Sequence, residues 1–133
     1  MKRVTLGILA LASAIQLSCS DAGPVAGEVA INFDSPSADD WAVRFTVIAS
    51  SPQTLQGLSA TCSGCQAFVR MVSDSVLRAI VYGGPLPTSE LARLSVSDTR
   101  ALTAYKVTLL EVAGGDLGIY SPATRGLSLS VSR

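Results

Sequence analysis

The sequence predicts an all-β fold, a single antiparallel β-sandwich of about eight strands, on three observations. Apolar and polar residues alternate with a period of two along most of the chain from residue 28 onward. Clusters of Gly, Pro, Ser and Asp separate the alternating segments at short intervals. The segments are half polar, which is typical of antiparallel sheets with one solvated face.

The first two expected strands show the alternation most clearly. In residues 28–33, the side chains on one face are those of Val29, Ile31 and Phe33. In residues 41–48, they are those of Trp41, Val43, Phe45 and Val47. Because one face of each strand is expected to pack in the core, this pattern predicts that the Trp41 side chain is buried.

The remaining expected strands are residues 66–72, 76–82, 91–97, 105–109 and 127–131. Ser73-Asp74-Ser75 predicts a tight hairpin between the first two of these segments. The stretch from residue 99 to residue 104 is ambiguous, because Asp98 could cap a helical turn there.

The N-terminus has the layout of a bacterial lipoprotein signal. Lys2 and Arg3 precede the apolar run 4–17, and Ser18 then stands directly before Cys19. We therefore expect a signal peptide over residues 1–18, a lipidated Cys19 and tether over 19–27, and the sandwich over 28–133. This organisation predicts a protein of the bacterial cell envelope, attached to a membrane through its N-terminal lipid.

Two alternatives to the lipoprotein signal stay open. The apolar run has 14 residues, whereas a membrane-spanning helix needs about 20; an uncleaved anchor is therefore disfavoured. Gln16 and Leu17 match the lipoprotein cleavage box imperfectly. A plain signal peptide cut after Ala12 or Ala14 would leave Cys19 as a free thiol.

The composition excludes several classes of function. The chain has no histidine, which removes the commonest general base and the commonest zinc ligand. It has ten basic and ten acidic residues; without Lys2 and Arg3 the balance is eight against ten, a net charge of −2. This balance gives no footprint for nucleic acid. We expect no cofactor and no enzymatic activity, and a small hydrolase is the least favoured alternative.

Cys62-Ser63-Gly64-Cys65 is the one local motif with chemical content. A disulfide that closes the loop between two strands is the favoured interpretation, because exported proteins meet an oxidising compartment. A redox-active pair would need a helix after the motif, and the residues that follow it look like a strand. A zinc site would need two further ligands.

Two other clusters are weaker candidates. Asp34, Asp39 and Asp40 lie close together in sequence, but their spacing lacks the repeat of a calcium loop; we expect no metal site. Trp41 could stack against a sugar, although its alternation favours the core.

The segment Leu91-Ala92-Arg93-Leu94-Ser95-Val96-Ser97-Asp98, followed by Tyr105-Lys106-Val107-Thr108-Leu109, resembles cohesin-like, immunoglobulin-like sandwiches of bacterial surface proteins. The resemblance covers roughly residues 27–133 and transfers no binding residue. We expect a non-enzymatic binding or structural module, with an unidentified protein or glycan as the candidate ligand. The alternative function is an envelope thiol-redox or chaperone-like factor that uses Cys62 and Cys65.

Overall fold

The structure, a computed structural model, describes residues 23–120 and 122–132. These residues form nine strands: β1 (Gly27–Asp34), β2 (Asp40–Ala49), β3 (Leu55–Ala60), β4 (Gln66–Ser73), β5 (Val76–Tyr82), β6 (Glu90–Val96), β7 (Tyr105–Gly114), β8 (Ile119–Tyr120) and β9 (Gly126–Val131). They also form two short 3-10 turns, η3 (Leu102–Ala104) and η4 (Pro122–Thr124). Within these residues no helix is long and apolar enough to span a membrane.

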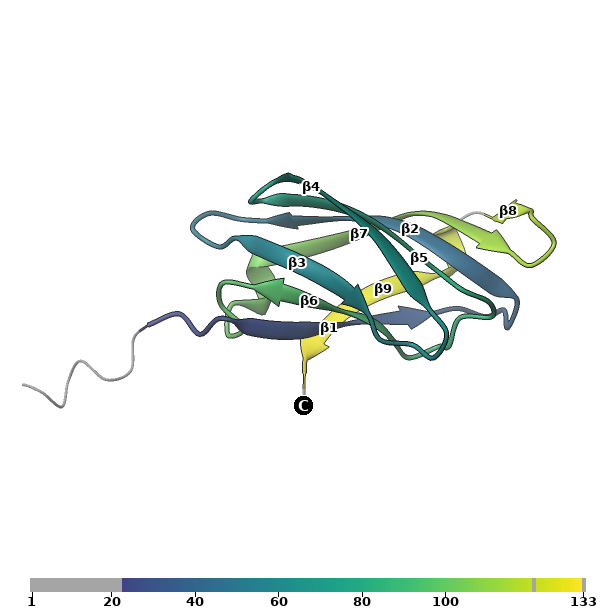
Figure 1. Cartoon of the computed structure of the whole chain (residues 1–133), viewed down its shortest axis with the longest axis horizontal. Coiled ribbons are helices and arrows are strands. Elements are labelled where there is room, and N and C mark those ends of the chain that lie inside the picture. The colour runs from purple at the N-terminus through teal and green to yellow at the C-terminus, as the bar shows by residue number, and fades with distance from the viewer. Residues whose placement is uncertain (1–22, 121, 133) are drawn as a thin grey trace, which may run out of the picture.

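The strands form two sheets that pack face to face. One sheet has the order β3-β6-β1-β9 and the other has the order β4-β5-β2-β7-β8. Figure 1 shows them as two layers, with β1 and β6 in the lower one and β4 and β2 in the upper one. Every strand pair described is antiparallel, which confirms the predicted single sandwich.

The core lies between the sheets and is made by the inward-facing positions of both. The alternation in β1 and β5, and in β2 from Val43 onward, correctly identifies these positions. The largest fully buried side chains include Phe45, Ile31 and Leu77 from these strands and Leu91 and Leu94 from β6. Because a one-residue slip would turn every side chain to the opposite face, this burial pattern also fixes which residues face outward.

The turns follow the expected pattern in part. The hairpin at residues 73–75 joins β4 to β5 as predicted. The ambiguous stretch 99–104 forms only the short turn η3. The Asp98 carboxylate instead accepts hydrogen bonds from the backbone N–H groups of Arg100 (3.0 Å) and Val25 (3.2 Å), so the chain before β1 is fixed to the loop after β6.

Candidate binding face

The outward side of the five-stranded sheet combines cationic and apolar side chains. We call this surface the arginine face and define it by Arg44, Thr46, Ile48, Phe68, Arg70, Arg78, Ile80, Lys106, Thr108, Leu110 and Glu111. In β2 and β5 these residues alternate with buried core residues, so the same period that builds the core also places them outside.

Strand register arranges the arginine face in rows that cross β4, β5, β2 and β7. One row consists of Phe68, Ile80, Arg44 and Glu111. The next row consists of Arg70, Arg78, Thr46 and Thr108. Arginines from three strands therefore lie beside apolar side chains from two of them.

A hollow of about 130 Å³ opens on this face. Phe68, Ile80 and Leu110 supply apolar side chains to its lining, and Arg44, Arg70 and Arg78 supply the charged ones. Leu110 is exposed because the pairing of β2 with β7 shifts between Arg44 and Phe45, which turns both Leu110 and Glu111 outward. Phe68 is the most exposed of the three apolar residues, at 66%.

The opposite outer face, on the four-stranded sheet, has a different chemistry. Its outward residues are small or polar and include Glu28, Asn32, Ser59, Arg93, Ser95, Ser128 and Ser130. Some of them hydrogen-bond to one another: Asn32 Nδ2 donates to Ser130 Oγ at 2.9 Å. In the described strands of this sheet, the one exposed large apolar side chain is Val131. The two faces of the sandwich are therefore chemically distinct.

The prediction that Trp41 is buried is wrong, because its side chain is 41% exposed. The pairing of β2 with β7 shifts between Asp40 and Ala42, so Trp41 is the extra residue of a bulge and Asp40 takes the inward position. Trp41 Nε1 donates a hydrogen bond to Asp39 Oδ1 at 3.0 Å. A Cβ on Gly115 would come within 2.6 Å of Trp41 Nε1, so the indole fits closely against this glycine.

Trp41 and Tyr82 help to line an open cavity of about 410 Å³ beside the arginine face. The rest of the lining consists mainly of the backbone of glycines, with Leu117 at the rim. The ring is held in place, which an aromatic stacking residue requires. Sugar stacking by Trp41, which the sequence pattern disfavoured, is an untested alternative.

Asp40 and Arg125 form a buried ion pair at one end of the sandwich. Arg125 donates from Nε to Asp40 Oδ2 (2.8 Å) and from Nη2 to Asp40 Oδ1 (2.9 Å), and Ser35 Oγ also donates to Oδ2. The Asp40 side chain is fully buried and that of Arg125 is 10% exposed. The Arg125 guanidinium also lies 5.4 Å from the centroid of the Tyr120 ring.

The ion pair links the two sheets, since Asp40 begins β2 and Arg125 directly precedes β9. Burial by itself would raise the pKa of Asp40, but the hydrogen bonds from Arg125 and Ser35 and the charge of Arg125 outweigh it, so the pKa lies below its ordinary value. Asp40 is therefore a charged carboxylate with its oxygens already bonded. Asp40 therefore has a structural role, and loss of either partner alone would leave a buried charge without its counter-charge.

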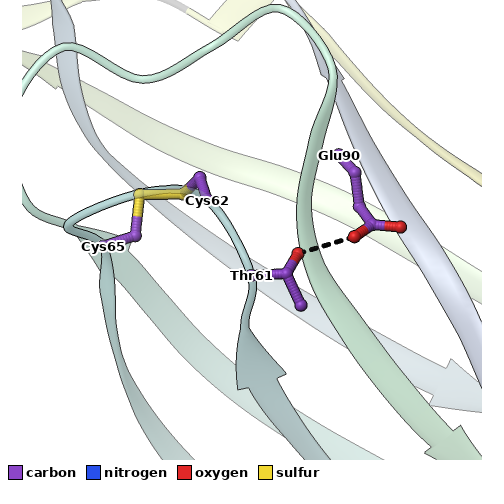
Figure 2. Close-up of a disulfide and its surroundings, with 4 residues drawn as sticks. All are labelled: Thr61, Cys62, Cys65 and Glu90. Carbon is purple, nitrogen blue, oxygen red and sulfur yellow. Dashed lines mark hydrogen bonds between the residues drawn. A yellow bond between two sulfur atoms is a disulfide. The ribbon is translucent and has the colours of Figure 1, made fainter.

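Cys62 and Cys65 are joined by a disulfide, as the motif predicts (Figure 2), with 5.3 Å between their Cα atoms. The bridge closes the loop that leaves β3 in one sheet and enters β4 in the other. Gly64 has a φ of 74°, which this turn requires and which glycine adopts without steric cost. Beside the bridge, Thr61 Oγ1 donates to Glu90 Oε2 at 2.8 Å (Figure 2).

The surroundings of the bridge fit a structural role. Both cysteines are half-buried and pack against the core. The segment after Cys65 is strand β4, so no helix N-terminus lies there to lower a thiol pKa. The predicted lipidation site, Cys19, lies outside the described residues.

The acidic residues near the start of β2 bind different partners and do not form one cluster. Asp39 accepts from Trp41, and Asp40 accepts from Arg125 and Ser35. In residues 23–120 and 122–132, no three His, Cys, Asp or Glu side chains are grouped to hold a metal ion. Asp34 ends β1 on the exposed side of the strand.

The arginine face was not identified from sequence. Its residues come from four strands, and only the register between strands shows that Arg70 lies opposite Arg78. The available signal was the alternation itself, since Arg44, Arg70 and Arg78 all occupy outward positions of strands predicted from the sequence. The Asp40–Arg125 pair gave no local signal, because 85 positions separate the two residues.

The overall architecture is similar to that of a known module. A cohesin module from the family 33 glycoside hydrolase of Clostridium perfringens ATCC13124 superposes with a TM-score of 0.61 over 80% of this chain and 84% of that one, at 9% sequence identity. This likeness shows a cohesin-like fold. No family model matches the sequence, and no curated protein matches it either.

Proposed function

We propose that this protein is a non-enzymatic binding module of the bacterial cell envelope, and that its arginine face binds a partner protein. One observation supports this proposal above the others. Apart from Val131, the exposed large apolar side chains of the described strands all belong to the five-stranded sheet. Three of these side chains, Ile48, Phe68 and Leu110, lie on the arginine face itself. Apolar side chains that gather on an exposed surface commonly mark a binding site.

The composition of the arginine face also fits a protein interface. Aromatic residues, arginine and aliphatic side chains are enriched at the centres of such interfaces. Phe68 and Leu110 are exposed, and Ile80 is half-buried between them and the arginines. The likeness to a cohesin module supports a binding or structural role in general terms.

The proposal includes a lipid anchor on Cys19. Val25 lies six positions after Cys19 and is fixed to Asp98 and Thr99, so the chain between Cys19 and Val25 can extend at most about 21 Å. A domain on such a short tether stays close to the membrane surface. Several acyl chains on one cysteine make such an anchor durable.

The anchor predicts a clear effect of Cys19→Ala in the bacterium that produces the protein. We expect the variant to lose labelled fatty acid and to leave the membrane fraction or remain unprocessed, because the thiol is the acylation site. Fractionation with radiolabelled palmitate measures both. Wild-type protein that stays in the membrane fraction without incorporating label would contradict the anchor.

Site-specific photo-cross-linking tests the arginine face as the binding surface. A photoreactive amino acid replaces Phe68 in one version of the full chain and Ser59 in another. Both positions are exposed and lie on edge strands, β4 and β3, of different sheets. We expect a discrete cross-linked protein from position 68 in intact cells and none from position 59. Equal products from both positions, or a product from position 59 alone, would contradict the proposal.

A further inference from the structure

The charges on the arginine face indicate what kind of partner it binds; this inference rests on the proposed function. We propose that the partner presents acidic side chains beside an apolar one, with a carboxylate bound between Arg70 and Arg78 and the apolar side chain in the hollow above Ile80.

The first observation is the distribution of ion pairs. The described residues contain seven basic side chains. Four of them pair with an acid: Arg44 with Glu111, Arg93 with Glu90, Arg100 with Asp98 and Arg125 with Asp40. The three without an acidic partner in the described part of the chain are Arg70, Arg78 and Lys106, and all three lie on the arginine face.

The second observation is that Arg70 lies directly opposite Arg78 in the antiparallel pair of β4 and β5. Residues in such positions have Cβ atoms about 4.5–5.5 Å apart, and like charges there are destabilising. An anion between the two guanidinium groups would remove that repulsion. The same row continues with the hydroxyl groups of Thr46 and Thr108, which can donate further hydrogen bonds.

The third observation distinguishes a carboxylate-bearing protein from other anions. The guanidinium fork matches both carboxylate and phosphate. However, the arginines surround a hollow lined by Phe68, Ile80 and Leu110, which a phosphate group alone would leave empty. An acidic residue next to an aliphatic one would fill both the charged and the apolar parts of the site.

The probe is a fluorescent peptide that contains glutamate and leucine. The test measures how tightly this peptide binds to the full-length protein, solubilised in detergent. A peptide with glutamine in place of each glutamate is the matched probe. We expect the glutamate peptide to bind about tenfold more tightly or better, and its affinity to fall with added salt. We expect the Arg70→Gln/Arg78→Gln variant to lose this preference. Arg93→Gln is the matched control, since Arg93 lies on the opposite face beside Glu90.

The same variant should fold at least as stably as the wild type, because it removes a like-charge pair; urea unfolding checks this point. Equal binding of the two peptides, no binding of the glutamate peptide, or equally tight binding of glycerol phosphate or DNA would overturn the inference. Those outcomes leave the cross-link from position 68 unaffected, whereas loss of that cross-link would instead contradict the proposed function.

Discussion

Replacing Asp40 by asparagine is expected to lower the free energy of unfolding by about 3–5 kcal/mol. The change leaves the Arg125 guanidinium, which is only 10% exposed, without its counter-charge in the interior. Such a loss is a large share of the roughly 5–15 kcal/mol that stabilises a typical domain. Urea unfolding of the two proteins at neutral pH measures the difference.

A double variant, Asp40→Leu/Arg125→Met, is the control for this prediction. It removes both charges together, and apolar replacements of a buried ion pair are often nearly neutral. We therefore expect it to be more stable than Asp40→Asn. A loss below about 1 kcal/mol for Asp40→Asn would show that the pair is not buried as described.

The ion pair also predicts a dependence on pH. The pKa of Asp40 in the folded protein lies below its ordinary value of 3.8, so the pair contributes full stability above that pH. The contribution disappears as the pH falls through the lowered folded-state pKa. Asp98 and Asp116 also have lowered pKa values, so they add to the pH dependence of both proteins. The quantity to compare is therefore the difference in free energy of unfolding between the wild type and Asp40→Asn. That difference should shrink only in acid.

Substitution of two phenylalanines tests which face of each strand points outward. The arginine face depends on this orientation. Phe45 is fully buried, whereas Phe68 is 66% exposed. Phe45→Ala should lower the free energy of unfolding by about 3–5 kcal/mol, because it leaves a cavity in the core. Phe68→Ala should change it by no more than about 0.5 kcal/mol, because the side chain has little packing to lose.

Equilibrium unfolding of both variants provides the comparison, and each serves as the control for the other. A large loss for Phe68→Ala with a small one for Phe45→Ala would mean that the strands present the opposite faces. In that case the arginines would not share an outer surface with Phe68.

Much of the fold could be predicted because local patterns specify it. Alternation correctly identified Val29, Ile31 and Phe33 as core residues of β1, and Ser and Asp residues marked the β4–β5 hairpin. Strand β3 was missed because a register shift between Leu55 and Gly57 breaks its period of two, which leaves Leu55 and Leu58 three positions apart. The error at Trp41 has a similar cause, because a bulge shifts the period without changing the sequence pattern.

The candidate site was less predictable, because it depends on relations between distant segments. The Cys62–Cys65 bridge could be predicted, since three positions separate the two residues and the turn between them contains glycine. Nothing in a single strand reveals that Arg70 faces Arg78 or that Asp40 meets Arg125. Such contacts follow from the strand register and the packing of the two sheets, which the whole core determines.

Photo-cross-linking from the two edge strands tests the central claim most directly, because it reports on the surface of the intact, anchored protein. The arginine face as the binding surface predicts a cross-linked partner from position 68 of the otherwise unaltered chain. It predicts no product from position 59 on the serine-rich face. A partner cross-linked from position 59 and absent from position 68 would contradict the account.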